Sequence, residues 1–71
     1  MKYLIVVEKT ETGFSAYSPD LDGCVATGST REDVEKLMKE AIEFHIAGLR
    51  TEGDDVPEST SYSTYHEVEA A

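Results

Sequence analysis

The sequence predicts an α+β domain with the element order β-β-β-α-β, in which one helix packs on one face of a small sheet. Two observations predict this class. Short β-branched and aromatic segments alternate with turn residues up to residue 28, and helical periodicity replaces them afterwards. The 71 residues suit a single domain, residues 1–71, and a chain this short leaves little room for a large active-site cavity.

Three strands are expected before the helix. Residues 4–7 are aliphatic and β-branched, and a polar segment with Gly13 follows, which is typical of a hairpin turn. Residues 14–18 form a second short strand that Pro19 closes, because proline has no N–H to donate to a ladder. Residues 25–27 form the third. The short connections predict an antiparallel meander.

A helix is predicted over residues 31–52. From Val34 to Leu49 the apolar residues recur on one side of a helix with 100° per residue, and the charged residues lie opposite. Thr30 is a suitable N-cap residue. Gly53 stands where a glycine commonly ends a helix.

A fourth strand is expected over residues 62–68, which are rich in aromatic and β-branched residues. Right-handed crossover places it beside the first strand and parallel to it, so the predicted strand order is 3-2-1-4. The first strand is then central and apolar on both faces, while one helix covers a single face. We therefore expect Tyr3, Ile5 and Val7 to form an oligomer face, buried in a homo-oligomer such as a dimer or tetramer.

The charge composition narrows the class of partner. Fifteen Asp and Glu residues against six Lys and Arg give a net charge of −9, which repels nucleic acid and anionic lipid and favours a basic partner. A single cysteine cannot form an internal disulfide, and no apolar stretch has the length of a membrane span or the form of a signal peptide. We expect a cytoplasmic protein that binds neither membranes nor nucleic acid directly.

The segment Asp20-Leu21-Asp22-Gly23 has three interpretations. As a calcium loop it fails, because the fifth position is Cys24 and the twelfth is Arg31. As the aspartyl motif of a phosphatase, it lacks the longer α/β domain that such an enzyme needs. The favoured interpretation is a turn, in which the aspartates bond the local backbone and Gly23 supplies a positive φ. A metal-dependent hydrolase of ribonuclease H or phosphatase type, using Asp20 and Asp22, stays as the alternative.

The cysteine and histidines fit structural roles better than catalytic ones. Cys24 is expected to be a buried strand residue, because no histidine stands in a recognisable arrangement with it. His45 falls on the apolar side of the helix, where a core imidazole is favoured over a ligand, and His66 is expected to be exposed. Their spacing does not suit zinc, and we expect no metal and no cofactor.

Acidic residues dominate the end of the chain. From residue 52 onward there are six Asp and Glu and no Lys or Arg. Such a segment is either a solvated surface or a surface that competes with RNA or DNA for a basic groove. From charge and loop position, the residues predicted to bind a partner are Asp20, Asp22, Asp54, Asp55 and Glu58.

The stretch "GFSAYSPDLDGCVATGSTREDVEKLMKEAIEFHIAGL" resembles the HicB-like antitoxins, and the likeness extends from about residue 3 to residue 68. The family pattern has an aromatic strand, a Pro-Asp-Leu-Pro-Gly-Cys turn, a Gly-x-Thr start to the helix, Glu-Ala in mid-helix and a proline before a last strand. The matching positions here are Pro19, Asp20, Leu21, Gly23, Cys24, Gly28, Thr30, Glu40, Ala41 and Pro57. Asp22 replaces the usual proline of the turn, which should loosen the loop.

This resemblance implies a fold similar to a partially degraded ribonuclease H and a non-enzymatic role. It implies an antitoxin that binds a small basic HicA-type toxin, an mRNA-cleaving enzyme, and covers its RNA-binding surface and catalytic histidine. Many HicB-like proteins continue into a DNA-binding domain, and no basic helix of that kind is found here, so DNA binding is not expected. A solitary oligomeric scaffold without a toxin is a third interpretation.

Overall fold

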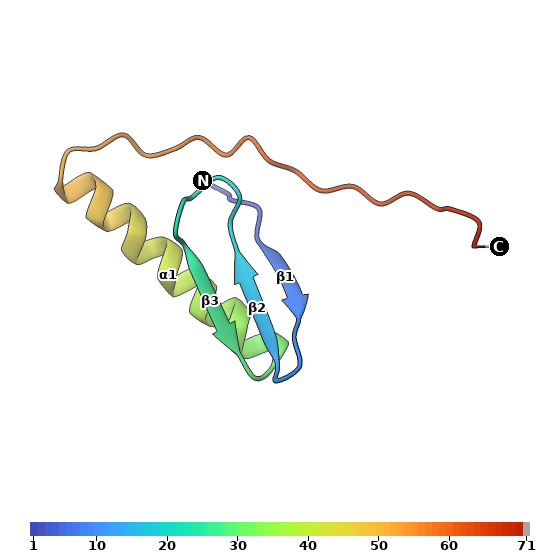
Figure 1. Cartoon of the computed structure of the whole chain (residues 1–71). Coiled ribbons are helices and arrows are strands. Elements are labelled where there is room, and N and C mark those ends of the chain that lie inside the picture. The colour runs from blue at the N-terminus through green and yellow to red at the C-terminus, as the bar shows by residue number, and fades with distance from the viewer. Residues whose placement is uncertain (71) are drawn as a thin grey trace.

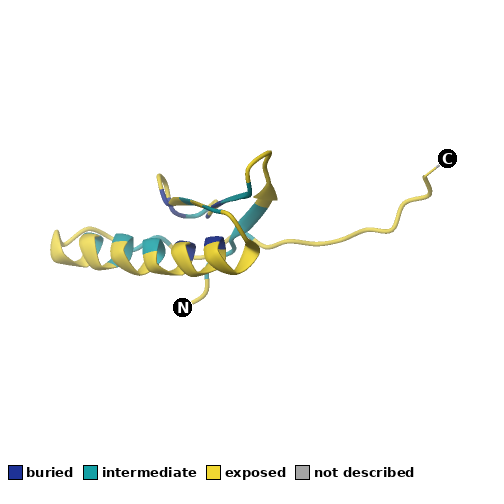
Figure 2. Cartoon of the chain, turned by 90° about the horizontal axis from the view of Figure 1, so that it is seen from below, coloured by how far each residue is buried: buried dark blue, intermediate teal, exposed yellow. Residues whose placement is uncertain are grey.

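Three strands and one helix form two layers in this computed structural model, which describes residues 1–70 (Figure 1). The strands are β1 (Val6–Lys9), β2 (Phe14–Tyr17) and β3 (Val25–Gly28), and the helix α1 (Arg31–Thr51) follows them. The sheet order is β1-β2-β3 with both pairs antiparallel. Viewed from below, α1 lies along one face of the sheet (Figure 2). The predicted α+β class, the meander and the helix are confirmed.

The register of the strands decides which side chains face the helix. Val7, Ala16 and Ala26 are aligned across the three strands on the face that α1 covers. Because side chains alternate along a strand, the neighbouring set of Val6, Tyr17 and Val25 lies on the opposite face. The buried core between sheet and helix is built from Ala16, Leu21, Cys24, Val34 and Met38.

Gly28 allows β3 to pass closely under the start of α1. A Cβ atom at this position would lie 2.7 Å from the backbone nitrogen of Val34, a distance that real side chains do not tolerate. The absence of a side chain therefore lets the first turn of the helix approach the sheet, which places Val34 in the core.

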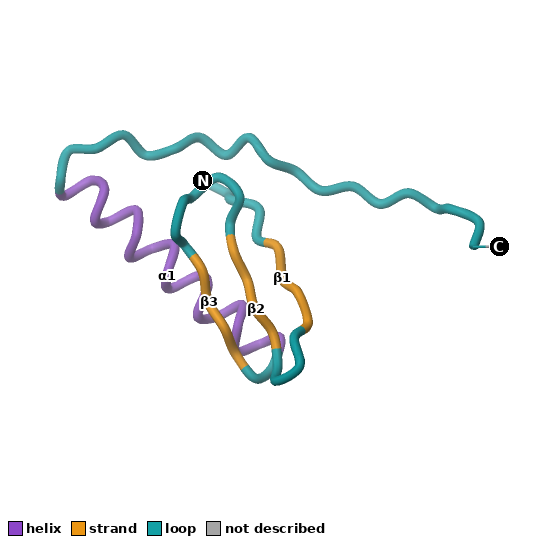
Figure 3. The backbone as a smooth tube through the Cα atoms, in the orientation of Figure 1, coloured by secondary structure: helices purple, strands orange, loops and turns teal. Residues whose placement is uncertain are grey.

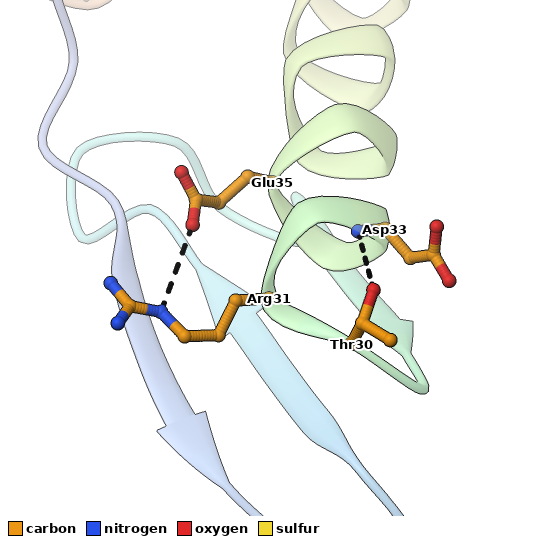
Figure 4. A network of polar contacts seen from close by, with 4 residues as sticks. All are labelled: Thr30, Arg31, Asp33 and Glu35. Atoms are coloured by element: carbon orange, nitrogen blue, oxygen red, sulfur yellow. Dashed lines mark hydrogen bonds and ion pairs between the residues drawn. The ribbon is translucent and has the colours of Figure 1, made fainter.

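The helix has the predicted cap at each end. The Thr30 hydroxyl accepts a hydrogen bond from the Asp33 N–H at 3.1 Å, and Arg31 Nε lies 4.0 Å from Oε2 of Glu35, one turn further along the helix (Figure 4). At the other end Gly53 has φ +74°, and the N–H groups of Gly53 and Asp54 donate back into the last turn, as in a Schellman motif. The helix ends at Thr51, one residue earlier than predicted. Within residues 1–70, no helix has both the length and the apolarity needed to cross a membrane.

The predicted fourth strand is not formed. Residues 54–70 are drawn as one extended loop that passes the sheet and then leaves it (Figures 1 and 3). Residues 60–61 of this segment are attached to the β2–β3 loop, as described below. In the described chain β1 is therefore an edge strand and not a central one. The likeness to a ribonuclease H fold stays a prediction.

The predicted oligomer face lies on the other side of the sheet from where we expected it. Tyr3, Ile5 and Val7 are half-buried and pack against the core cluster, so they belong to the face that α1 covers. The strand alternates as predicted, but the sequence could not say which of its two apolar sides the helix would choose. The uncovered face carries Val6, with the partly exposed side chains of Tyr17 and Val25 beside it.

Candidate functional site

The loop between β2 and β3 consists of two successive turns around a buried leucine. Leu21 N–H donates to the Ser18 carbonyl, and Cys24 N–H donates to the Leu21 carbonyl. Leu21 is fully buried and anchors the loop in the core, while Asp22 is exposed. Gly23 has φ +74°, which side chains other than glycine rarely adopt. The predicted turn with a positive φ at Gly23 is confirmed, but the Asp20 carboxylate does not bond the local backbone as predicted, because it bonds Thr60 and Ser61.

Asp20 does more than close this turn, because its carboxylate holds a distant segment of the chain. Its Oδ2 accepts hydrogen bonds from the backbone N–H groups of Thr60 at 3.2 Å and Ser61 at 3.1 Å. Its Oδ1 accepts hydrogen bonds from the hydroxyls of the same two residues, each at 3.0 Å. We call this arrangement the Asp20 clamp. The Ser61 N–H, together with the other three donors, lowers the pKa of Asp20, although partial desolvation opposes the shift.

Sequence reasoning did not identify Thr60 and Ser61 as partners of Asp20. They lie 40 and 41 residues away in the chain, so no local spacing links them. The available signal is the run Ser59-Thr60-Ser61, a series of hydroxyl donors next to an otherwise acidic segment. Such a run can satisfy a carboxylate through both its side chains and its backbone.

A second contact fastens the same segment to the start of the chain. The Tyr3 hydroxyl donates to the Pro57 carbonyl oxygen, and Val56 and Pro57 are half-buried. Close by, the buried Ser18 hydroxyl donates to the Leu4 carbonyl at 2.9 Å, which ties the stretch before β1 to the end of β2. Residues 57–61 thus cross the end of the sheet where the β2–β3 loop lies.

The five acids predicted to bind a partner lie in different places relative to the clamp. Glu58 lies two residues before Thr60, so the clamp brings it to the loop that carries Asp22. Asp54 and Asp55 are exposed just beyond the end of α1, before the chain reaches the loop. Asp20 itself is engaged by four donors and is less free to meet a partner than the other acids.

The same contacts weigh against the hydrolase alternative. Both oxygens of Asp20 already accept hydrogen bonds, so binding a metal ion there would require releasing the Thr60–Ser61 segment. Within residues 1–70, His, Cys, Asp and Glu side chains do not gather in groups of three or more that could hold a metal ion. Cys24 is buried, which raises the pKa of its thiol, the opposite of what a nucleophile needs.

An open apolar groove lies between the start of β3 and the second half of α1. Its lining includes Val25, Ala41, Phe44, His45, Leu49 and Glu52. Phe44 is 83% exposed, although aromatic side chains usually bury most of their surface. His45 is half-buried and lines this groove, and it is not in the core as predicted. The sequence feature that could have indicated this groove is Phe44, a phenylalanine outside the apolar stripe of the helix.

The family is shown by comparison with known proteins. The model of the HicB-like antitoxins of bacterial toxin-antitoxin systems matches residues 3–70. An uncharacterised 14.9 kDa protein of Haemophilus phage HP1 is 35% identical over 65 residues, which cover 92% of this chain and 49% of that protein. A UPF0150 protein of Helicobacter pylori is 40% identical over 47 residues, or 66% of this chain and 65% of the relative.

The chain therefore spans about half the length of the phage relative and just under two thirds of the Helicobacter relative. Among solved structures, a chain of the "HicA3 and HicB3 toxin-antitoxin complex" is 40% identical and superposes with a TM-score of 0.71, over 83% of this chain and 70% of that chain. The family model covers nearly all of the sequence, and the relatives and the solved structure cover between 66% and 92% of it. This chain belongs to the HicB-like antitoxin family.

Proposed function

We propose that this protein is a cytoplasmic antitoxin that binds a small basic HicA-type toxin and prevents it from cleaving mRNA. In this mechanism it performs no chemistry and works by covering the RNA-binding surface of the toxin. The observation that carries the proposal is the 40% identity to a chain of a toxin-antitoxin complex, with a TM-score of 0.71. Membership of an antitoxin family also argues against an enzyme.

The charge distribution supports a basic partner. The net charge of −9 gives the protein a negative field that attracts and orients a positively charged toxin over several ångströms. The free acids Asp22, Asp54, Asp55 and Glu58 lie on loops, where they can pair with lysine or arginine side chains without displacing a structural contact. A toxin surface that binds RNA phosphates meets the same kind of charge here.

The groove beside Phe44 supplies the apolar part of such an interface. Stable interfaces have an apolar, often aromatic centre inside a polar rim. Phe44 is an exposed apolar side chain, and the acidic Glu52 lines the same groove. Burying Phe44 against the toxin would add affinity, while the surrounding acids would set orientation and association rate.

An RNA-cleavage assay tests the proposal. A purified HicA-type toxin is mixed with increasing amounts of this chain, and cleavage of a labelled mRNA is followed. Cleavage should stop once the chain reaches a stoichiometric amount. If a large excess leaves cleavage unchanged and the two proteins do not bind each other, the chain is not the antitoxin of that toxin class.

Two matched triple variants separate the effect of the loop acids on toxin binding from the effect of net charge. The triple change Asp54→Asn, Asp55→Asn and Glu58→Gln should weaken toxin binding, chiefly through slower association. The control is the triple change Glu8→Gln, Glu11→Gln and Glu32→Gln, which removes the same charge from exposed positions at the other end of the sheet and at the start of α1. Equal effects of the two triples would show that only net charge matters.

A further inference from the structure

The chain concentrates its hydroxyl side chains in one segment after the helix. Residues 59–65, which we call the hydroxyl run, are Ser59, Thr60, Ser61, Tyr62, Ser63, Thr64 and Tyr65. They account for seven of the 17 Ser, Thr and Tyr residues in the chain. Within residues 1–70, the structure uses only two of these seven hydroxyls, those of Thr60 and Ser61, as hydrogen-bond donors. The run is therefore longer than the Asp20 clamp requires.

The hydroxyl run is accessible to an enzyme. It lies in the extended loop that follows α1, and every member except the half-buried Ser61 is exposed (Figures 1 and 3). An exposed, extended segment can enter the active site of a modifying enzyme without unfolding the domain. The hydroxyls of serine, threonine and tyrosine are the groups that protein kinases phosphorylate.

Thr60 is the exposed member of the run at which a phosphate would disturb a structural contact. Its Oγ1 lies 3.0 Å from Asp20 Oδ1, and its N–H donates to Oδ2 of the same carboxylate at 3.2 Å. A phosphate ester at Oγ1 removes the hydroxyl proton on which the first of these hydrogen bonds depends. It also adds a charge of about −2 beside the carboxylate, and like charges at this separation repel.

The clamp offers no local cation to balance that charge. Neither of the two segments that it joins, the β2–β3 loop and residues 51–70, contains a lysine or an arginine. A phosphate orders a loop when arginine side chains surround it and disrupts a contact when carboxylates do. The surroundings of Thr60 are of the second kind, with the Asp20 carboxylate in contact and Glu58 two residues before it.

We propose that Thr60 is a phosphorylation site and that its modification opens the Asp20 clamp. In this step the Thr60 oxygen attacks the terminal phosphorus of a nucleoside triphosphate, the bond from that phosphorus to the bridging oxygen breaks, and the nucleoside diphosphate leaves. The hydroxyl proton passes to a base of the protein kinase. The modification changes the net charge of the chain from −9 to about −11 and frees residues 60–61 from the β2–β3 loop.

The structural part of the proposal is tested with the full chain made by chemical synthesis and phosphorylated at Thr60. At neutral pH, proton–proton NMR contacts from Thr60 and Ser61 to Asp20 should be present in the unmodified chain and absent in the phosphorylated one. The same chain phosphorylated at Thr64 is the matched control. It carries the same charge in the same hydroxyl run, but Thr64 does not contact Asp20, so the contacts should remain. This measurement needs no toxin and is independent of the proposed function.

A second control separates the added charge from the lost hydroxyl. Thr60→Val removes the hydroxyl donor without adding charge and leaves both backbone donors, so the contact from Ser61 to Asp20 should persist. Unchanged methyl signals of Val34 and Met38 should show that the phosphorylated domain stays folded. The proposal is overturned if the contacts survive phosphorylation of Thr60, if either control loses them to the same extent, or if the core signals are lost as well.

Mass spectrometry of the protein isolated from its own cells tests whether the site is used. Because no lysine or arginine follows Arg50, trypsin releases the whole hydroxyl run in one peptide that begins at Thr51. Part of this peptide should carry one phosphoryl group, and fragmentation should place it on Thr60. A peptide without phosphate in both growing and starved cells, or with phosphate only at other positions, would overturn the assignment of Thr60.

Discussion

At the residue scale, the Asp20 carboxylate joins two parts of the chain that are far apart in sequence. It lies on the β2–β3 loop and accepts four hydrogen bonds from Thr60 and Ser61. Two of the donors are backbone N–H groups, so the clamp fixes the path of the main chain and not only the side chains. The path of the acidic segment past the β2–β3 loop therefore depends on this carboxylate together with the Tyr3 contact to Pro57.

Removing this carboxylate should free the segment without unfolding the domain. In Asp20→Ala the amides of Thr60 and Ser61 lose their acceptor, and we expect their hydrogen exchange to accelerate towards the rate of an unprotected peptide. Asp22→Ala is the control, because Asp22 is exposed on the same loop and should leave both amides protected. Unchanged exchange in Asp20→Ala would mean that the clamp does not hold in solution.

The same clamp should open in acid. Hydrogen bonds from Ser61 and Thr60 lower the pKa of Asp20, so the folded chain favours the ionised form more than the unfolded chain does. The attachment is complete above about pH 4, where a free aspartate is ionised, and is lost as the pH falls through the lowered pKa. NMR titration of the Thr60 and Ser61 amide shifts should follow that step, and Asp20→Asn should abolish it.

A separate prediction concerns the stability of the domain, because the structure leaves no room for a side chain at Gly28. Gly28→Ala forces a methyl group against the Val34 backbone and should lower the free energy of unfolding by about 1–3 kcal/mol. Gly48→Ala is the matched control, since nothing lies within 4 Å of a Cβ there and alanine is favoured inside a helix by up to about 1 kcal/mol. Urea unfolding of both variants should therefore give shifts of opposite sign.

At the scale of the elements, α1 has two sides with different tasks. Val34 and Met38 are fully buried against the sheet, whereas Phe44 projects into solvent beside β3. Residues that point to the core contribute to stability, and exposed apolar residues contribute to it little. The helix therefore separates the residues that hold the domain together from those available for a partner.

Two truncations on this helix should show the separation. Met38→Ala leaves a cavity in the core and should cost about 2–5 kcal/mol of unfolding free energy. Phe44→Ala should change stability by no more than about 0.5 kcal/mol and should weaken toxin binding under the proposed function. Urea denaturation measures the first effect and a binding titration the second. A strongly destabilised Phe44→Ala variant would contradict the exposed position of this ring.

At the scale of the whole molecule, local signals predicted the local structure. The β-branched runs located the three strands, although β1 is Val6–Lys9 and not residues 4–7 as predicted, and Thr30 and Gly53 gave the two ends of the helix almost to the residue. What failed depends on contacts between distant segments. The fourth strand is not formed, and the side of β1 that α1 covers follows from packing, which alternation alone leaves undecided. The carboxylates of the site were predicted, but not the Thr60–Ser61 pair or the groove at Phe44.

The net charge of −9 makes a prediction that involves no single residue. If a basic toxin is attracted by the field of the whole protein, raising the salt concentration from about 0.05 M to 0.5 M should slow association by on the order of tenfold. Dissociation should change much less. Stopped-flow mixing at several salt concentrations measures both rates. A rate of association independent of salt would show that the acidic surface does not guide the toxin.

Cys24 provides the molecule with its own chemical probe. The side chain lies in the core three residues after Leu21, and burial raises the pKa of the thiol, so an alkylating reagent finds neither access nor thiolate while the loop is closed. The sequence contains no other cysteine. The alkylation rate of the unmodified protein therefore measures how frequently the β2–β3 loop opens and exposes this thiol. Slower labelling when a toxin is added would measure, without any engineered tag, how strongly a bound partner holds that loop shut.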